Sequence, residues 1–509
     1  MEVREALNPV QAAQCDPEDY PDEFPLCMEG TRRAVILLAT DKVLDALDSW
    51  ERFWMNGVAG SGKTTLATSL VDKLRSRGVI VATFFCKRDD SDRRNPRRIL
   101  PTLAHQLSLT FPEYRKHLAE ALSINIQKQI PQPADPAKQL SLFIVDPLLA
   151  SGLDSRRIVL LIDALDECDE KPCELLVNAL VGVNLPQHCV LVLVSRRLRY
   201  LQAKLDRTCS LLVDLDQALD SPDMASDIYR LLKDRLIRIA ATYQDSDWPS
   251  PGELSSLTKR AGGLFIWATI VCNFIDQPSY REELSRLLNH PDVAVGIDQL
   301  YTHALDIEFA KLHGKTAWVE DYKSVMGVIL CSVVPLSATA ISSLLGKREN
   351  TVKGTLAILQ PVLLWGSPVR LAHASLADYL LSERSGKLWI EPRYLHLALA
   401  RGCLLALCSP SFHFNMMGIS DSSILVDGLP DIQSRRQELP EDVNYSARHW
   451  AQHLNQVGDL NDEQKTSISS LITQFFECNF LFWLETLSLL GAVYRGVDSL
   501  NLLHGWLKV

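Results

Sequence analysis

The chain has 509 residues, of which 47% are hydrophobic and 22% charged, the balance of a soluble protein with three or four domains. Its net charge of −10 argues against a general nucleic-acid binder, which would need a basic surface. The N-terminus lacks the pattern of a signal peptide, and the apolar stretch 480–493 contains Glu485 and is too short to span a bilayer. The twelve cysteines are scattered without a C-x-x-C pair, which is typical of reduced thiols. These features predict a cytoplasmic protein with neither a membrane nor a nucleic-acid partner.

Residues 1–26 are acidic, contain proline and show little periodicity, so we expect a poorly ordered lead-in. After a predicted helix at about 30–47, the apolar run 53–55 predicts a buried strand, and apolar residues at helical spacing follow over 66–74. Between them lies the stretch Gly57-Val58-Ala59-Gly60-Ser61-Gly62-Lys63-Thr64-Thr65. Strand, G-x-x-x-x-G-K-[ST] loop and helix in this order are the context in which the motif binds phosphate.

The loop 57–65 has the residue types that a nucleoside phosphate needs. Its three glycines carry no Cβ, so successive backbone N–H groups can curl around phosphate oxygens. The helix that begins near Gly62 adds unpaired N–H groups and the positive end of its dipole. Lys63 supplies a charge for the β and γ oxygens, and Thr64 supplies a hydroxyl for Mg²⁺. We therefore predict that this loop binds ATP/ADP or GTP/GDP with Mg²⁺, and the sequence leaves the choice of base open.

Four further apolar runs alternate with helical segments along the next part of the chain, at 79–85, 158–162, 190–194 and 211–213. Strands that are apolar almost throughout are buried on both faces, which indicates a parallel sheet covered by helices on each side. We therefore predict an α/β domain built on a five-stranded parallel sheet.

Beyond Met224 the periodicity is almost wholly helical. The exception is the segment 361–371, which predicts a small hairpin set among helices. One hairpin among helices suits a winged-helix unit at about 320–385. We find no repeat of 30–45 residues, and therefore predict neither a propeller nor a solenoid.

A second chemical site follows the strand 158–162, where Asp163 is followed by Asp166 and Glu167. An acidic residue at the carboxyl end of a buried strand lies where open α/β sheets place their ligands. Asp163 is therefore positioned to hold Mg²⁺ through its waters, and either Asp166 or Glu167 can polarise an attacking water. We favour Glu167 as the base. The motif gains weight from the phosphate-binding loop 100 residues earlier.

The strand 190–194 ends in Ser195-Arg196-Arg197. A cation at this strand end can reach the γ-phosphate and report whether it is present. We assign that role to Arg196 and regard Arg197 as part of a solvated basic turn.

Two other patterns do not indicate sites. His449 and His453 share one helix face, but the glutamate of H-E-x-x-H and a third ligand are missing, so we interpret the segment as an aromatic packing face rather than a zinc site. The charged segment 87–94 mixes both signs and contains no aromatic residue, which is typical of a solvated loop.

The motifs at 57–65, 163–167 and 195–196 together resemble those of NACHT-type NTPases of the STAND class, within the ASCE group of P-loop NTPases. The chain is most similar to fungal heterokaryon-incompatibility NACHT proteins, whose P-loop domain is also described as nephrocystin-like. The likeness covers roughly residues 27–500, through further segments at Cys27…Gly30-Thr31-Arg32, Arg94-Asn95-Pro96-Arg97-Arg98, Gly263-Leu264-Phe265-Ile266-Trp267-Ala268, Val369-Arg370-Leu371-Ala372-His373-Ala374-Ser375 and Tyr445-Ser446-Ala447-Arg448-His449-Trp450.

The resemblance implies an order of domains and a function. After the lead-in at 1–26, it implies a nucleotide-binding domain at 27–218, a helical domain at 219–318, a winged helix at 319–386 and a second helical domain at 387–509. Such proteins are signalling switches, closed with the diphosphate and self-associating with the triphosphate. His373 matches the winged-helix histidine that contacts the β-phosphate, whereas Phe265 departs from a proline that relatives place near the base.

The resemblance also implies an N-terminal effector domain and C-terminal repeats, for which this chain has no counterpart, so we expect either a truncated gene or a bare switch that works with separate effector or sensor chains. Two functions remain open at this point. We favour a switch that a slow hydrolysis resets and that forms homo-oligomers in the triphosphate state. The alternative is a turnover NTPase of the chaperone or remodelling type. A degenerate binding scaffold is disfavoured because Lys63, Thr64, Asp163 and Glu167 are all present.

Overall fold

The structure is a computed structural model of the chain, and it divides into two compact units, residues 1–300 and 301–509. The described residues are 3–18, 20, 23–46, 52–127, 135–153, 157–209, 211–219, 221–289, 297–310, 316–364, 366, 368–420, 426, 429 and 431–508. The expected hairpin at 361–371 and the expected lead-in at 1–26 each lie partly outside this set.

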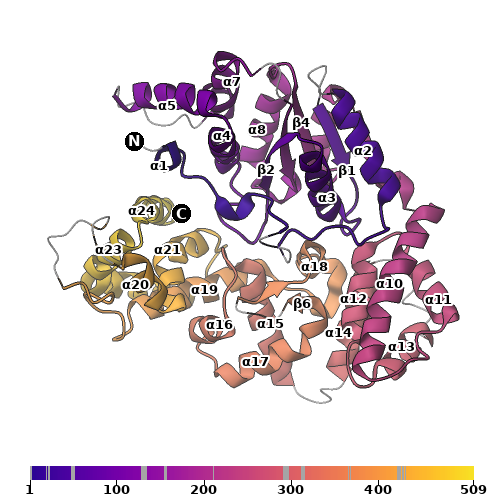
Figure 1. The fold of residues 1–509 in the computed structure, drawn as a ribbon. Coiled ribbons are helices and arrows are strands. Elements are labelled where there is room, and N and C mark those ends of the chain that lie inside the picture. The colour runs from indigo at the N-terminus through magenta and orange to yellow at the C-terminus, as the bar shows by residue number, and fades with distance from the viewer. Residues whose placement is uncertain are drawn as a thin grey trace. The chain divides into compact units, whose positions relative to one another are not determined.

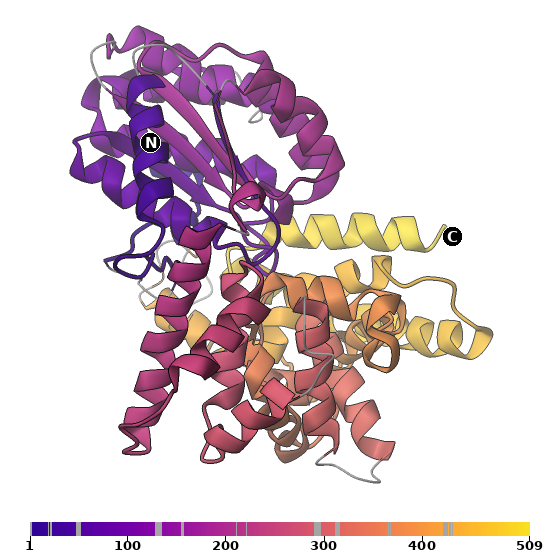
Figure 2. The same ribbon diagram turned by 90° about the vertical axis from the view of Figure 1, so that its right-hand side faces the viewer.

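The first unit contains the predicted five-stranded parallel sheet, in the order β2-β3-β4-β1-β5 (Figure 1). Its strands are β1 (Arg52–Asn56), β2 (Ile80–Phe85), β3 (Ile158–Asp163), β4 (Cys189–Ser195) and β5 (Leu211–Asp214). Each of the five corresponds to one of the apolar runs in the sequence, and Figure 2 shows the strands lying between helices. Because β4 lies between β1 and β3, the loops that follow β1 and β3 are separated by one strand at the carboxyl edge of the sheet.

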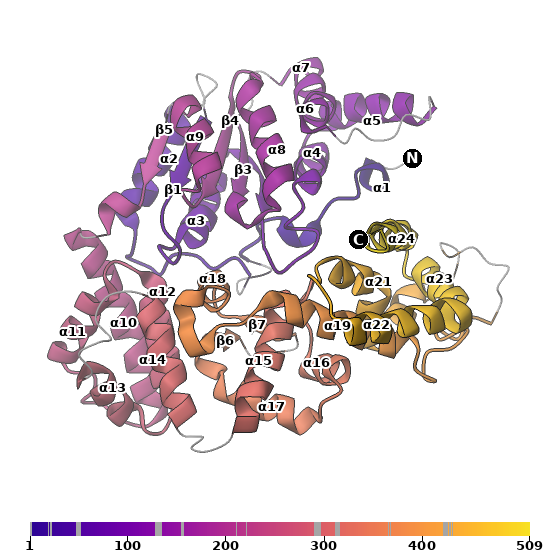
Figure 3. The same ribbon diagram turned by 180° about the vertical axis from the view of Figure 1, so that it is seen from behind.

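The helices of the first unit are α1 (Val3–Leu7), α2 (Arg33–Ala46), α3 (Lys63–Ser76), α4 (Ile99–Thr110), α5 (Pro112–Gln127), α6 (Pro136–Leu140), α7 (Asp146–Ala150), α8 (Glu170–Gly182), α9 (Arg199–Thr208), α10 (Pro222–Thr242), α11 (Pro251–Ala261), α12 (Phe265–Ile275) and α13 (Tyr280–Asn289). Helices α2 and α3 cover one face of the sheet, and α4 and α8 cover the other (Figure 3). The alternation of side chains along each strand divides the core accordingly. In β3, Val159 and Leu161 pack with α3, whereas Leu160 and Ile162 pack with α4 and α8.

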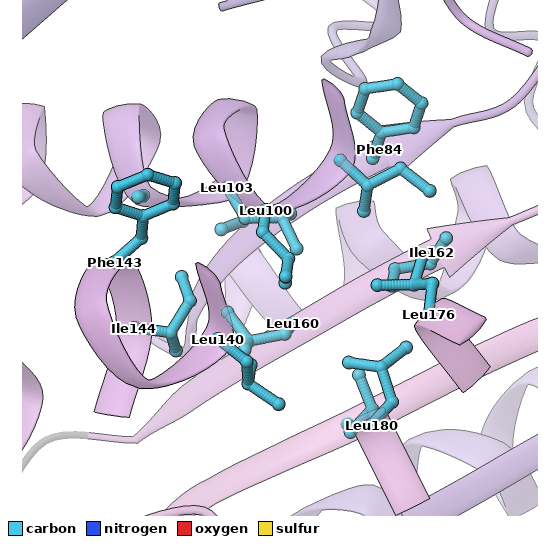
Figure 4. Close-up of a cluster of buried hydrophobic side chains, with 14 of the residues drawn as sticks. Phe84, Leu100, Leu103, Leu140, Phe143, Ile144, Leu160, Ile162, Leu176 and Leu180 are labelled. Atoms are coloured by element: carbon cyan, nitrogen blue, oxygen red, sulfur yellow. The ribbon is translucent and has the colours of Figure 1, made fainter. Parts of the chain in front are cut away.

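The larger of the two cores is shown in Figure 4, where Leu160 and Ile162 of β3 meet leucines of α4 and α8 and aromatic side chains of β2 and the turn before α7. Leu103 and Phe143, which the figure labels, are both fully buried. This packing holds β3 rigidly, so the acidic residues that follow it are carried on a fixed support.

The N-terminal segment differs from our expectation of a poorly ordered lead-in. Val3 and Leu7, on α1, are buried in the same core as α4, and the backbone N–H of Val10 donates to the Thr102 hydroxyl at 3.0 Å. Burial of small groups of apolar residues outweighs the acidic composition that suggested disorder. Residues 1–2, 19 and 21–22 lie outside the described part of the chain.

Helix α14 (Ile297–Ala310) includes the boundary between the units. The second unit then contains α15 (Thr316–Cys331), α16 (Ala338–Leu345), α17 (Glu349–Ile358), β6 (Leu363–Leu364), β7 (Arg370–Leu371), α18 (Ala374–Leu380), α19 (Pro392–Leu407), α20 (Ile432–Glu438), α21 (Glu441–Asn455), α22 (Asp462–Gln474), α23 (Phe480–Leu489) and α24 (Val493–Trp506). Strands β6 and β7 pair antiparallel, which confirms the predicted hairpin, although residues 365 and 367 within it are not described. Among the described residues, no helix is both long and apolar enough to cross a membrane.

The histidines of α21 lie in a buried polar cluster within the second unit. His453 Nδ1 lies 2.9 Å from His396 Nδ1 of α19, and His453 Nε2 lies 2.6 Å from the Tyr445 hydroxyl. The Tyr445 oxygen also accepts a hydrogen bond from the backbone N–H of Val333 at 3.0 Å. His449 packs on the Tyr445 ring, with the centroids 5.0 Å apart. Tyr445 and His453 are thus held by hydrogen bonds as well as by ring packing.

Candidate nucleotide-binding site

The candidate site lies at the carboxyl edge of the sheet, where parallel strands leave their loops. The glycine-rich loop follows β1, the acidic loop 163–167 follows β3, and the arginines 196–197 follow β4. Since β4 pairs with both β1 and β3, the three segments leave neighbouring strands at one edge. The topology therefore assembles the three motifs that the sequence presents separately.

The glycine-rich loop has the backbone shape that its sequence predicts. Gly60 and Gly62 adopt left-handed conformations, with φ of 79° and 85°, and Gly62 caps the N-terminus of α3. An L-residue with a side chain would be strained at either position. Lys63, the first residue of α3, donates from Nζ to the carbonyl oxygens of Gly57 and Val58, at 2.7 and 2.8 Å. The ammonium group is thus held over the loop that would surround the phosphates.

Gly60 is required for a second reason, which the sequence did not indicate. A Cβ at this position would lie 1.9 Å from Cγ2 of Ile266, in the first turn of α12, and the Ile266 N–H donates to the Gly60 carbonyl at 3.3 Å. The phosphate-binding loop therefore contacts the helical segment that follows the sheet. A movement of α12 cannot leave the loop unaffected.

Asp163 ends β3 with its carboxylate buried and without a hydrogen-bond partner. Its side chain is 1% exposed, and no described group hydrogen-bonds to either oxygen. Burial raises the pKa of Asp163 to about 7, while the Thr64 hydroxyl and Lys63 lie close enough to oppose that shift. An unpaired buried carboxylate is costly, and the cost is removed when a cation binds. The donor set, one carboxylate and one hydroxyl beside a phosphate-binding loop, fits the preference of Mg²⁺ for oxygen ligands.

Asp166 and Arg196 form a two-point pair at the ends of β3 and β4. Asp166 Oδ1 accepts from the Arg196 backbone N–H at 2.9 Å, and Oδ2 accepts from Arg196 Nε at 2.7 Å. The Asp166 side chain is buried. With both oxygens engaged, Asp166 is poorly placed to accept a proton from water, and its evident action is to orient Arg196.

Glu167 is half-buried, and its Oε2 accepts the backbone N–H of Arg88 at 3.0 Å. Burial raises the pKa of Glu167, and the charge of Asp166 adds to the effect, while the bond from Arg88 opposes it. A carboxylate with a raised pKa is suited to accept a proton near neutral pH. Of the two acids that the sequence left open, the geometry favours Glu167 as the base.

The charges at the strand ends all act on Lys63. Burial lowers the pKa of Lys63, and the charge of Arg196 lowers it further. The carboxylates of Asp166, Asp163 and Asp216 oppose this effect and favour the charged ammonium. The motifs are therefore close enough to form one electrostatic unit.

Arg197 is not the freely solvated side chain that the sequence predicted. It forms an ion pair with Asp214 at the end of β5, with Nη2 to Oδ2 at 3.0 Å. Two residues later, Asp216 Oδ1 accepts the backbone N–H of Val58 at 2.7 Å. Sequence analysis missed Asp216, although an acidic residue just after a strand that neighbours β1 was a usable signal.

Arg32 is a further residue of the site to which sequence analysis gave no role. Its side chain is buried, and Nη2 donates to the carbonyl of Ser61 in the glycine-rich loop. Its guanidinium lies 4.8 Å from the centroid of the Phe265 ring. Burial lowers the pKa of Arg32, and its buried Nη1 has no hydrogen-bond partner among the described residues. Ser61 Oγ and the side-chain amide of Asn56 are likewise buried and without a hydrogen-bond partner among the described residues.

His373 lies in the second unit, as the residue that caps α18. Its Nδ1 accepts the backbone N–H of Ser375 at 3.1 Å and lies 2.8 Å from the Ser375 hydroxyl. Because Nδ1 is an acceptor, the neutral ring carries its proton on Nε2. This is the tautomer that a donor to phosphate requires. The proposed contact with a nucleotide stays a prediction.

Comparison with known protein sequences gives two findings. Residues 36–197 match the family model described as nephrocystin 3, N-terminal. The chain is 23% identical over 488 residues to the vegetative incompatibility protein HET-E-1 of Podospora anserina, an alignment that covers 90% of this chain and 35% of that protein. The chain therefore spans about a third of the length of this relative.

Two solved structures are similar at a lower level. One is a STAND protein with a tetratricopeptide repeat sensor from Pyrococcus horikoshii, at 14% identity, with 92% of this chain and 63% of that chain covered and a TM-score of 0.38. The other is the Aeropyrum pernix ORC2 protein with ADPNP and ADP, at 13% identity, with 71% and 94% covered and a TM-score of 0.35. The fold assignment rests on the sheet order and the glycine-rich loop themselves.

The family model matches the part of the chain that contains the glycine-rich loop, the acidic loop and Arg196, and the similarity to HET-E-1 extends over most of the remainder. The resemblance drawn from the motifs is therefore confirmed: residues 36–197 are similar to the nephrocystin 3 N-terminal family, and most of the chain is similar to a fungal vegetative incompatibility protein.

Proposed function

We propose that this chain is a nucleotide-dependent signalling switch, which binds a nucleoside triphosphate with Mg²⁺, hydrolyses it slowly and changes conformation with the bound nucleotide. The observation that carries the proposal is the carboxylate of Asp163, which is buried and has no hydrogen-bond partner among the described residues. It ends β3 and lies close to Lys63 and Thr64, which follow β1 on the other side of β4. A protein that only used the sheet as a scaffold would gain stability by replacing this carboxylate with an apolar side chain.

In the proposed binding mode, the backbone N–H groups of 60–65 and the N-terminus of α3 hold the phosphates, and Lys63 neutralises the β and γ oxygens. Thr64 and Asp163 would hold Mg²⁺, which supplies charge neutralisation at those oxygens. Arg32 Nη1, Ser61 Oγ and Asn56 are unpartnered polar groups available to the rest of the nucleotide.

For hydrolysis, we assign the general base to Glu167 and the γ-phosphate contact to Arg196. Asp166 positions Arg196 through its two hydrogen bonds. A γ-phosphate would compete with Asp166 for the Arg196 guanidinium, so the pairing of Arg196 can differ between the triphosphate and diphosphate states. The hydrolysis would reset the switch.

The switch itself requires the nucleotide to act on more than the sheet. We propose that residues 319–386 form a winged helix whose His373 donates from Nε2 to the β-phosphate in the closed diphosphate state. The order of helices and hairpin and the tautomer of His373 support this proposal. We also propose a nucleotide-binding domain at 27–218, a helical domain at 219–318 and a second helical domain at 387–509.

Opening in the triphosphate state would expose surfaces for self-association, so we expect a homo-oligomer in that state, with separate effector or sensor chains as partners. HET-E-1 is named as a vegetative incompatibility protein, and an incompatibility or innate-immunity role for this chain is a proposal by that likeness. We also propose a cytoplasmic location, which the scattered cysteines without a C-x-x-C pair support.

The test is the variant His373→Ala. Loss of a hydrogen bond to a charged group costs the closed state about 1.5–3 kcal/mol, which shifts the closed-to-open ratio roughly 10- to 100-fold. We expect faster diphosphate release and self-association at lower triphosphate concentration, measured by stopped-flow release and by mass in solution. His413→Ala, which removes an exposed histidine of the same unit, is the matched control.

An unchanged diphosphate off-rate and oligomer mass in His373→Ala would leave this histidine with only its capping role on α18. Steady turnover that rises with a polymeric substrate, with no nucleotide retained through purification, would instead support the remodelling NTPase.

A further inference from the structure

The segment after β5 runs beside the glycine-rich loop, although the two are about 150 residues apart in the chain. Strand β5 pairs in parallel with β1, with Asn56 opposite Asp214, and the Leu215 N–H continues the pairing by donating to the Asn56 carbonyl at 2.9 Å. Because both strands end at the same edge, the residues that follow them lie side by side. This register places Asp216 next to the first turn of the loop.

Asp216 and Lys63 hold opposite sides of the same residue. Asp216 Oδ1 accepts the Val58 N–H at 2.7 Å, while Lys63 Nζ donates to the Val58 carbonyl at 2.8 Å. Val58 is 41% exposed, so the packing of its own side chain adds little to these two hydrogen bonds. The position of the lysine anchor therefore depends on the hydrogen bond to Asp216.

Asp216 is itself held in place by Asp214. The Asp216 N–H donates to Asp214 Oδ1 at 3.1 Å, and the buried Asp214 carboxylate is paired with Arg197 of the β4 end. A chain of contacts thus runs from β4 through β5 to the glycine-rich loop. Close packing at Gly57, where a Cβ would lie 3.0 Å from the Cβ of Leu215, leaves the loop little room to shift away.

We infer that Asp216 is a positioning residue for phosphate binding: its hydrogen bond to the Val58 N–H sets the entrance of the glycine-rich loop and thereby the placement of Lys63. The inference rests on the proposed nucleotide-binding function and deepens it. Asp216 would touch neither the phosphates nor the reacting atoms, so it should affect affinity and not the chemical step. The acceptor oxygen matters here more than the charge, because a carboxylate beside the phosphates is otherwise unfavourable.

The test compares Asp216→Ala with Asp216→Asn in the full chain. Asp216→Ala removes the acceptor, and we expect the Kd of the Mg²⁺-triphosphate to rise about tenfold, with the single-turnover hydrolysis rate of bound nucleotide unchanged. Asp216→Asn keeps an acceptor oxygen, and we expect an affinity within about twofold of the parent. Asp72→Ala removes an exposed carboxylate of α3 and is the control for the change in net charge.

A second measurement needs no nucleotide. Hydrogen exchange of a peptide that contains residues 57–62 should speed up about tenfold in Asp216→Ala, since the Val58 amide loses its acceptor, and should not change in Asp72→Ala. Unchanged exchange and affinity in Asp216→Ala would overturn the inference, as would equal losses in Asp216→Ala and Asp216→Asn. If Lys63→Ala abolishes binding while Asp216→Ala does not affect it, only this inference fails. If the parent binds no nucleotide, the proposed function fails and the exchange result still decides the role of Asp216.

Discussion

The glycine-rich loop and the charged residues at the ends of β3, β4 and β5 serve one site but are held together differently. In the loop, Lys63 bonds to carbonyls only five and six residues away. At the strand ends, Asp166 bonds to a residue 30 positions away and Asp216 to one 158 positions away. The bonds of Lys63 to the loop are local in the sequence, whereas the strand-end pairs exist only because the sheet has this strand order.

Within both regions the polar groups differ in how well they are paired. Lys63, Asp166 and Arg196 have partners in this structure, while Asp163 and, in the loop, Ser61 Oγ have none among the described residues. The unsatisfied region around Asp163 is suited to a ligand that brings a cation. The following changes would break or sharpen this contrast.

The largest effect is expected at Glu167. Glu167→Gln keeps the side-chain shape but removes the proton acceptor, so hydrolysis should slow about 100-fold while Mg²⁺-triphosphate binding is retained. Phosphate release in single turnover measures the first, and equilibrium binding the second. Glu170→Gln, an exposed glutamate three residues later, should behave as the parent. A parental rate in Glu167→Gln together with a slow Asp166→Asn would move the base by one residue.

Lys63→Ala tests the loop itself. Loss of the ammonium group should weaken triphosphate binding at least about tenfold, or about 1.4 kcal/mol. Lys73→Ala, later on the same helix α3, removes an identical group away from the loop and serves as the control. A folded Lys63→Ala protein that binds triphosphate as tightly as the parent would remove the assignment of the loop.

The pH dependence of metal-assisted binding tests the unsatisfied region. With its pKa raised to about 7 by burial, Asp163 must lose its proton before a cation can bind, so Mg²⁺-dependent affinity should fall about tenfold between pH 8 and pH 6. The terminal phosphate also takes up a proton in this range. Asp163→Asn is therefore measured in parallel. The part of the pH dependence of affinity that is present in the parent and absent in Asp163→Asn belongs to Asp163.

The same shift has a consequence for folding in the absence of ligand. Because the folded-state pKa of Asp163 lies above its ordinary value of 3.8, the folded protein binds more protons than the unfolded chain between about pH 4 and pH 7. Its contribution to stability therefore falls as pH rises through this window. Denaturant titrations measure the free energy of unfolding, which should fall more steeply between about pH 4 and pH 7 in the parent than in Asp163→Asn. Equal pH dependence in the two proteins would contradict the raised pKa of Asp163.

The smallest effect is expected at Ala164, the residue after Asp163, which adopts a left-handed conformation with φ 55° and ψ 43°. This conformation costs a residue with a Cβ about 1 kcal/mol, so Ala164→Gly should be neutral to stabilising by up to about 1 kcal/mol. Ala119→Gly, within the helix α5, should destabilise by a similar amount. Denaturant midpoints measure both, and a clear loss of stability in Ala164→Gly would show that the strain is absent.

Much of the first unit was predictable because its signals are local. Each strand is a short apolar run between helices. The glycine-rich loop is recognised from its own glycines, lysine and threonine. Asp163 was also predictable, since a buried strand that ends in an acid has a defined place in such folds. The hairpin at 361–371 was recognised for the same reason, as a break in a helical pattern.

The N-terminal segment shows where composition misleads. Its acidic and proline-containing sequence predicted disorder, but Val3 and Leu7 find an apolar surface on α4 to pack against. A few apolar residues are too weak a signal in sequence, because their burial depends on a partner surface formed by residues about 100 positions later.

What the amino-acid sequence by itself determined is therefore the fold class, the phosphate-binding loop and the identities of the acids, since hydrophobic periodicity and glycine spacing act over a few residues. What only the tertiary structure decided is which charges meet. The pairing of Asp166 with Arg196, of Asp216 with Val58 and of Arg32 with Ser61 depends on strand order and register. No short-range pattern encodes these, because each bond joins residues that the chain brings together only after the sheet has formed.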